Sequence, residues 1–177
     1  DEKLIKLFKI GFAPKNSTFL LESIKTKQYK KDVIKKSGLF GFADSKIYDR
    51  FRSRIMFPIS NTSNKVIAFG GRVFGVDDPA KYMNSPETPL YHKSEVFYGL
   101  NLSRDMIRKE NYAILVEGYT DVIQLFQAGI KNVIAVSGTA FTDQHVNQIR
   151  RLTSKAFLAY DGDSAGANAT LRAGYSL

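Results

Sequence analysis

The 177-residue sequence contains no cysteine and no tryptophan, and it has only two histidines. The absence of cysteine excludes disulfide bonds and cysteine-ligated zinc, and it agrees with a reducing compartment. No apolar stretch approaches the roughly 18 residues that a membrane-spanning helix needs, and no secretory signal pattern opens the chain. We therefore expect no membrane partner. His92 and His145 are too isolated to have the spacing of metal ligands, and we assign them no role.

The charge is strongly uneven along the chain. The net charge of the protein is +9. Residues 1–110 contain 21 lysines and arginines against 12 acidic residues, whereas residues 111–177 contain five of each. A basic half beside a neutral half predicts a polyanionic partner. Alternatively, the lysines only keep the first half soluble. The sequence also starts at Asp1, within an amphipathic pattern and without a methionine, so we expect a piece of a longer protein.

Two acidic clusters each follow a short apolar run. Glu-Gly-Tyr-Thr-Asp at 117–121 follows the run 113–116, and Asp-Gly-Asp-Ser-Ala-Gly at 161–166 follows the run 156–160. Such runs are typical of strands buried on both faces of a parallel sheet. Carboxylates at the carboxyl ends of neighbouring parallel strands converge where open α/β sheets bind ligands. They repel one another unless a cation lies among them, and hard oxygen ligands favour Mg²⁺ or Mn²⁺. The pattern predicts a metal site for phosphate chemistry.

The first half predicts two short helices, over 19–27 and 30–37, followed by a β-hairpin. From Phe51 to Ile59 every second position is apolar except Ser53, which predicts a strand. Its core face would carry Phe51, Ile55, Phe57 and Ile59, and its other face would gather the guanidiniums of Arg50, Arg52 and Arg54. Alternatively, Arg54 pairs internally with an acid such as Asp49.

Turn residues at 61–64 lead into a second strand over 66–74. Gly70 and Gly71 within this strand would let another backbone approach closely. Residues 77–93 are polar and interrupted by proline, which predicts an irregular loop. A helix capped by Asn101 or Ser103 would then run to about residue 109.

From residue 112 the pattern becomes β-α, three times over, which predicts a parallel sheet with right-handed crossovers. The strands are expected at 112–116, 132–137 and 155–161. The helices are expected at 119–128, ending at Gly129, at 142–152 with Thr142 as N-cap, and after Asp163. We expect a domain boundary near residue 110.

The acidic clusters resemble the Toprim domain of primases, type IA and type II topoisomerases and some nucleases. Its marks are a glutamate after the first strand and an Asp-x-Asp after a later one, matched here by Glu117 and by Asp161 with Asp163. Motifs in the first half narrow the choice of family, and motifs in the second half continue the match. Together they resemble the motifs of bacterial DnaG-type primases and follow the same order along the chain. These motifs occupy residues 49–59, 70–73, 81–88, 98–100, 117–121 and 137–140.

This resemblance implies an α/β fold, with a mixed α+β N-terminal subdomain over 1–110 and a C-terminally truncated Toprim-type parallel sheet over 111–177. The sequence does not contain the family's amino-terminal zinc ribbon, its later acidic motif or its helicase-binding carboxyl-terminal module. We therefore expect part of the metal site to be missing from this piece, and no zinc in it.

The resemblance also implies the site residues. Glu117, Asp161 and Asp163 are the expected catalytic residues and metal ligands. Asp121, one helical turn beyond Glu117, is expected either to bind the metal ion or to orient the residues that bind it. Alternatively, Asp163 only caps a helix and Glu117 lies in a turn. The expected contacts to nucleotide phosphates or nucleic acid are Arg50, Arg52, Arg72, Lys81, Asn84 and Lys93.

The implied function is DNA-directed synthesis of short RNA primers during replication, in the cytoplasm at the replication fork. Mg²⁺ or Mn²⁺, as two ions, would assist nucleotidyl transfer from NTPs. The implied partners are a single-stranded DNA template, NTPs, the RNA primer and, through a region absent here, the replicative helicase of the primosome. The alternatives are another Toprim enzyme, a topoisomerase or nuclease, or a non-catalytic nucleic-acid-binding fragment.

Overall fold

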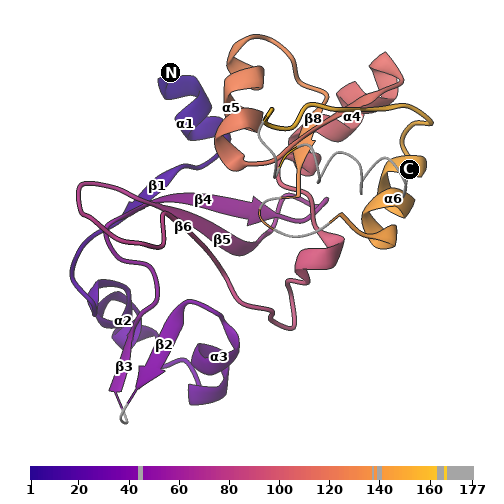
Figure 1. The fold of residues 1–177 in the computed structure, drawn as a ribbon. Helices are drawn as coiled ribbons and strands as arrows, with labels where there is room; N and C mark the ends of the chain where they lie inside the picture. Colours follow the sequence, from indigo (N-terminus) through magenta and orange to yellow (C-terminus); the bar gives the residue numbers. More distant parts are fainter. Residues whose placement is uncertain (44–45, 137, 139–140, 163–165, 167–177) are drawn as a thin grey trace. The chain divides into compact units, whose positions relative to one another are not determined.

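The computed structural model describes residues 1–43, 46–136, 138, 141–162 and 166 (Figure 1). Contacts within the chain divide it into two compact units. One unit contains Asp1–Leu4, Ile59–Val66 and His92–Leu177, and the other contains Ile5–Pro58 and Ile67–Tyr91. Among the helices of the described residues, none is long and apolar enough to cross a membrane. The chain begins with helix α1 (Glu2–Leu7).

The second unit is built on a four-stranded sheet of order β1-β4-β5-β6. The strands are β1 (Gly11–Ala13), β4 (Arg54–Ser60), β5 (Val66–Val73) and β6 (Tyr82–Asn84). The predicted hairpin is confirmed, because β4 and β5 are neighbours in the sheet. In the turn between them, the Asn61 carboxamide accepts hydrogen bonds from the backbone N–H groups of Ser63 and Lys65, at 3.0 Å each.

The face assignment of the first hairpin strand is partly wrong. Phe51, Phe57 and Ile59 are buried as predicted, but the strand begins at Arg54, and Arg54 is itself only 1% exposed. Ser53 adopts a left-handed conformation, with φ of 50°, and this turn interrupts the alternation that the sequence indicates. The three guanidiniums therefore do not share one exposed face.

The sequence prediction missed four strands, β1 and the three described next, because no wholly apolar run marks them. β2 (Phe40–Ala43) and β3 (Lys46–Asp49) form a separate antiparallel hairpin, and β6 lies within the predicted irregular loop. Helices α2 (Phe19–Ile24) and α3 (Lys31–Lys36) flank this hairpin, and the 3₁₀ turn η1 (Lys25–Lys27) follows α2 (Figure 1). The Asp49 carboxylate accepts hydrogen bonds from the N–H groups of Leu20 (2.6 Å) and Leu21 (3.0 Å), which ties β3 to the start of α2.

The first unit contains the predicted parallel sheet, in the order β8-β7-β9. Its strands are β7 (Ala113–Val116), β8 (Val133–Ala135) and β9 (Ala156–Leu158), and both strand pairs are parallel. β7 and β8 are largely buried, as predicted, but β9 is not, since Phe157 is 59% exposed. The central buried cluster consists of Phe97, Leu100, Ile107, Ala113, Leu115, Ile134 and Ile149.

Helices surround this sheet. α4 (Leu100–Glu110) and α5 (Tyr119–Gln127) both contact β8, α6 (Asp143–Arg150) follows, and the 3₁₀ turn η2 (Lys93–Glu95) contacts α6 (Figure 1). Thr142 caps α6 as predicted, since its hydroxyl accepts a 3.3 Å hydrogen bond from the His145 N–H. The predicted cap of α4 is wrong. Gly99 holds that position, and the hydroxyl of Ser103 instead donates to the Val133 carbonyl at 2.6 Å.

Candidate active site

Glu117 and Asp161 meet at one edge of the parallel sheet. Glu117 directly follows β7, and Asp161 lies three residues beyond β9, the parallel neighbour of β7. The Glu117 Oε1 atom accepts a 3.0 Å hydrogen bond from the backbone N–H of Asp161. The two parallel strands thus bring residues 44 positions apart into direct contact. Asp163, the third acid of the predicted set, lies outside the described residues.

Asp121 has a structural contact within its own helix. Its Oδ2 atom accepts a 2.9 Å hydrogen bond from the backbone N–H of Gly118, which precedes α5. A carboxylate in the first turn of a helix satisfies a backbone donor and interacts favourably with the helix dipole. This contact holds the start of α5, and therefore the turn that carries Glu117, in a defined conformation.

Tyr160 is a neighbour of Glu117 that the sequence analysis placed only in an apolar run. Burial, and secondarily the negative charge of Glu117, raises the pKa of the Tyr160 phenol to about 12. The phenol is therefore protonated at neutral pH and lies close enough to Glu117 to sense its charge. The signal available in the sequence was its position directly before Asp161.

Gly166 closes the space around the two acids. A Cβ atom at this position would lie 2.9 Å from Glu117 Oε1 and would collide with the backbone carbonyl oxygen of Asp161. The glycine is therefore required by the close approach of its backbone to both acids. This gives a physical reason for the last glycine of the second acidic cluster.

The donor chemistry of this edge fits a hard cation. Glu117 and Asp161 offer carboxylate oxygens, which suit Mg²⁺ or Mn²⁺ and are unlike the sulfur and imidazole sets of structural zinc. Within the described residues, no three Asp, Glu or His side chains are grouped closely enough to hold a metal ion. The described part of the edge thus supplies two acidic residues.

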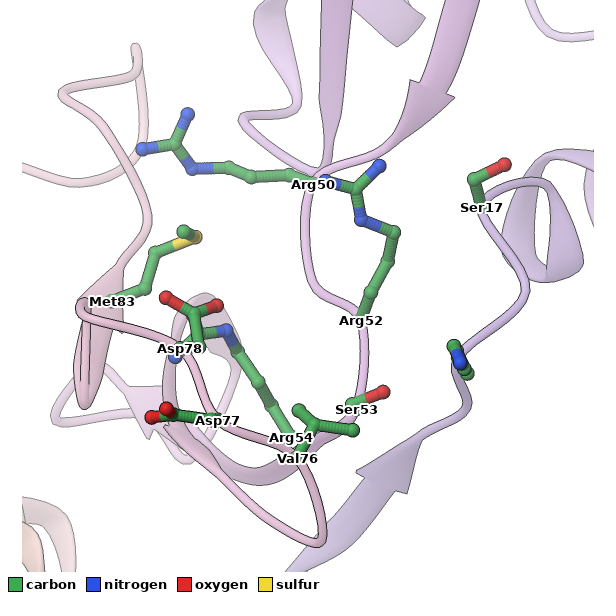
Figure 2. A pocket seen from close by; sticks show the side chains of 10 residues that line it. Ser17, Arg50, Arg52, Ser53, Arg54, Val76, Asp77, Asp78 and Met83 are labelled. Carbon is green, nitrogen blue, oxygen red and sulfur yellow. The ribbon is translucent and has the colours of Figure 1, made fainter.

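Two of the expected basic residues of the second unit, Arg50 and Arg52, line a pocket of about 480 Å³, whereas Arg72 and Lys81 do not (Figure 2). Lys15, Arg50, Arg52 and Arg54 line it together with Asp77 and Asp78. Arg50 Nη2 donates to the carbonyl of Asn84 at 3.5 Å, so two residues of the predicted phosphate-binding set lie together. Arg50 Nε is buried and has no hydrogen-bond partner among the described residues. Arg52 is exposed, and its guanidinium lies 5.2 Å from the ring centroid of Tyr48.

Arg54 differs from its neighbours. Its guanidinium donates to Asp78 Oδ2 at 2.6 Å, and not to Asp49, the acid considered from the sequence. In Figure 2 its guanidinium lies beside the Asp78 carboxylate, whereas Arg50 and Arg52 extend in other directions. Arg54 is therefore an internal ion-pair partner and not part of a cationic stripe.

Arg72, Lys81 and Tyr82 lie at the β5–β6 ladder. Arg72 is the register partner of Tyr82, and its guanidinium lies 5.6 Å from the centroid of that ring. Arg72 and Lys81 are both exposed, and Tyr82 is 47% exposed. Lys93, the last residue of the predicted set, begins the η2 turn in the other unit and is partly buried.

His145 has a structural environment. Its ring packs against Phe97, with centroids 4.5 Å apart, and stacks on Phe141 at 5.8 Å. Burial lowers the pKa of its imidazole to about 4, so the ring is neutral near pH 7.

Comparison with known proteins decides the family. Residues 1–104 match the family described as the DNA primase catalytic core, N-terminal domain, and residues 111–177 match the Toprim domain. The chain belongs to the DNA primase catalytic core family. The DNA primase of Staphylococcus aureus (strain COL) is 42% identical to it over 99% of this chain, which spans 30% of that relative.

Solved structures of primase cores have the same fold. The RNA polymerase domain of Mycobacterium tuberculosis primase DnaG is 36% identical, with a TM-score of 0.90, and the match covers 98% of this chain and 59% of that one. A DnaG primase catalytic domain bound to ssDNA is 39% identical, with a TM-score of 0.88 over 97% of this chain and 53% of that one. The α/β fold with a Toprim-type parallel sheet is thereby confirmed.

Proposed function

We propose that this chain is the part of a primase that synthesises short RNA primers on single-stranded DNA from NTPs during replication. The observation that carries the proposal is the contact between Glu117 and Asp161 at the carboxyl edge of two parallel strands. The family match supports the reaction type, and the related catalytic domain bound to ssDNA supports the template.

In the proposed reaction, the 3′-hydroxyl of the growing primer attacks the α-phosphorus of an NTP. The new P–O bond forms as the bond to pyrophosphate breaks, and the hydroxyl proton would pass to water, assisted by the Glu117 carboxylate. Glu117, Asp161 and Asp163 would hold Mg²⁺ or Mn²⁺, which, when bound, lowers the pKa of the hydroxyl and stabilises charge on the phosphate oxygens. Glu117 would also orient the second acidic loop through its bond to the Asp161 N–H.

The basic residues would align the nucleotide and the template. Arg50 and Asn84, which are hydrogen-bonded, and the exposed Arg52, Arg72 and Lys81 would contact phosphates. Lys93 would contribute from the η2 turn. Most of the binding energy would then come from phosphate contacts, so single-stranded DNA binding would depend little on base sequence.

Further parts of the proposal concern the larger protein. We place it at the replication fork in the cytoplasm, with the primer, NTPs and the replicative helicase of the primosome as partners. We also propose that residues 1–110 and 111–177 act as the basic and the metal-binding subdomain, respectively.

The test is Glu117→Gln in the full-length protein. A glutamine amide oxygen can still accept the bond from the Asp161 N–H, so the geometry is retained while the negative charge is lost. We expect primer synthesis with Mg²⁺ or Mn²⁺ to fall by at least about a hundredfold. DNA affinity, measured by fluorescence anisotropy, should stay nearly unchanged. Glu110→Gln, an exposed position at the end of α4, is the control.

Normal primer synthesis by the Glu117→Gln protein would refute the catalytic role. Nicking of supercoiled DNA without NTPs would favour a topoisomerase or nuclease. A chain that binds no Mn²⁺ at millimolar concentration would instead be a non-catalytic nucleic-acid-binding module.

A further inference from the structure

Arg54 is the most buried charged side chain among the arginines, lysines, aspartates and glutamates that the structure describes, with 1% exposure. A guanidinium does not lose its proton in a protein, so its burial requires hydrogen-bond acceptors on several sides. It lies at the first position of β4, beside the pocket that Arg50 and Arg52 also line.

The acceptors that surround this guanidinium come from one short segment, residues 78–81. Nη2 donates to Asp78 Oδ2 at 2.6 Å, and Nη1 donates to the carbonyl oxygens of Ala80 (2.8 Å) and Lys81 (3.4 Å). The other carboxylate oxygen, Asp78 Oδ1, accepts from the Ala80 N–H at 2.8 Å. The segment is therefore folded around the guanidinium, and Asp78 closes it.

This arrangement holds the backbone of Lys81 from two sides. The Lys81 carbonyl accepts from Arg54 and also from the Val73 N–H at 2.9 Å. Lys81 directly precedes β6, in which Asn84 pairs with Gly70 of β5. Its side chain remains exposed, so the segment is fixed at its backbone while its ammonium group is available to a ligand.

Gly71 makes room for the stem of Arg54. A Cβ atom at position 71 would lie 3.0 Å from Arg54 Cδ and 2.9 Å from Phe51 Cδ1. The glycine pair that the sequence analysis singled out thus admits a side chain across β5, in addition to any neighbouring backbone. Arg54, Gly71 and Asp78 form one packing arrangement that ends at Lys81.

We infer that Arg54 and Asp78 are positioning residues for nucleotide binding, which hold residues 78–81 so that Lys81 and Asn84 meet the phosphates of the incoming nucleotide. This inference rests on the proposed function. Arg54 itself does not touch the phosphate, because it is buried and its terminal nitrogens already donate to the segment. It acts through the backbone of Lys81.

The test compares Asp78→Asn with Asp77→Asn in the full-length protein. Both acids line the same pocket, but of the two only Asp78 pairs with Arg54. We expect Asp78→Asn to raise the KM for NTPs about tenfold and to leave kcat within about twofold of the wild-type value. The reason is that the loss of one charged hydrogen bond weakens binding of the ground state and of the transition state equally. Asp77→Asn should leave both constants unchanged. Arg54→Lys, which keeps the charge but not the forked geometry, should behave like Asp78→Asn.

Hydrogen exchange provides the readout that a general loss of stability would not reproduce. In the Asp78→Asn protein, the Ala80 amide should exchange faster while the amides of β7 and β8 keep their protection. A fall in kcat at unchanged KM, or faster exchange throughout the chain, would overturn the inference.

Failure of the proposed function is distinguishable from failure of this inference. If the wild-type protein makes no primers, the proposed function fails, and binding of Mg²⁺-ATP measured by calorimetry replaces KM. A weaker nucleotide affinity in Asp78→Asn, but not in Asp77→Asn, then still supports positioning, and equal affinities overturn it.

Discussion

At the acidic edge of the parallel sheet, the space beside the backbone limits which residues can follow Asp161. Gly162 and Gly166 belong to the same loop, yet their surroundings differ. A Cβ atom at Gly166 would collide with the Asp161 carbonyl and approach Glu117, whereas a Cβ atom at Gly162 would meet no described heavy atom within 4 Å. The effect of a methyl group therefore depends on which of the two glycines carries it.

We predict that Gly166→Ala in the full-length protein lowers primer synthesis at least about tenfold, because the methyl group must displace Glu117 or Asp161 from its position. Mn²⁺ affinity, measured by titration, should fall with it. Gly162→Ala is the matched control and should retain activity within about twofold. Equal activities of the two variants would show that the contact at residue 166 does not position the acids.

Arg54 and Asp78 illustrate what single positions conceal in a sequence. The alternation around residue 54 places the arginine on a polar face, and its nearest acid in the sequence is Asp49. Its partner is 24 positions away, and Asp49 instead accepts from the start of α2. Such a pairing depends on the β5–β6 connection, which local periodicity does not describe.

At the scale of elements, the start of α4 depends on a glycine conformation and on a packing contact. Gly99, the N-cap residue, has φ of +84°, and a Cβ atom there would lie 3.0 Å from Val122 Cγ1 of α5. Gly129, after α5, has φ of +89°, but a Cβ atom there would meet no described atom within 4 Å. Both positions disfavour a side chain by backbone strain, and only Gly99 adds a steric conflict.

We predict that Gly129→Ala lowers the free energy of unfolding by about 1 kcal/mol and that Gly99→Ala lowers it by about 1 kcal/mol more. The difference measures the conflict with Val122, since the backbone strain is similar at the two positions. Urea unfolding of both variants, followed by circular dichroism, tests this. If the two variants lose the same free energy of unfolding, the methyl group at residue 99 fits beside Val122 without a steric conflict.

The elements with the clearest local pattern were predicted from the sequence. α5, α6 and the parallel strands β7 and β8 have clear periodicity or wholly apolar runs, and they are within a few residues of the predicted bounds. β1, β2, β3 and β6 are as short as β7 and β8, but no wholly apolar run marks them, and over three or four residues a period of two cannot be distinguished from chance.

At the scale of the whole molecule, the charge distribution is the feature most directly tied to the proposed partner. The basic half contains nine more positive than negative groups, and Arg50, Arg52 and Lys15 line one pocket within it. Binding of a polyanion to such a surface releases counterions, so its affinity depends steeply on salt.

We predict that the logarithm of the affinity for single-stranded DNA falls linearly with the logarithm of the salt concentration. The slope should be about −0.7 for each phosphate contacted. Arg52→Ala, at an exposed position, should reduce the slope by about 0.7 and weaken binding to all sequences alike. Lys36→Ala, an exposed position in α3, is the control. An affinity that does not change with salt would contradict phosphate-dominated binding.

The sequence by itself determined the parallel sheet, the β4–β5 hairpin and the charge asymmetry, because these follow from local periodicity and composition. The tertiary structure alone decided that Glu117 contacts the Asp161 backbone, that Tyr160 lies near this carboxylate and that Arg54 is enclosed by residues 78–81. These contacts join residues far apart in the chain, and only the packing of strands and loops brings them together.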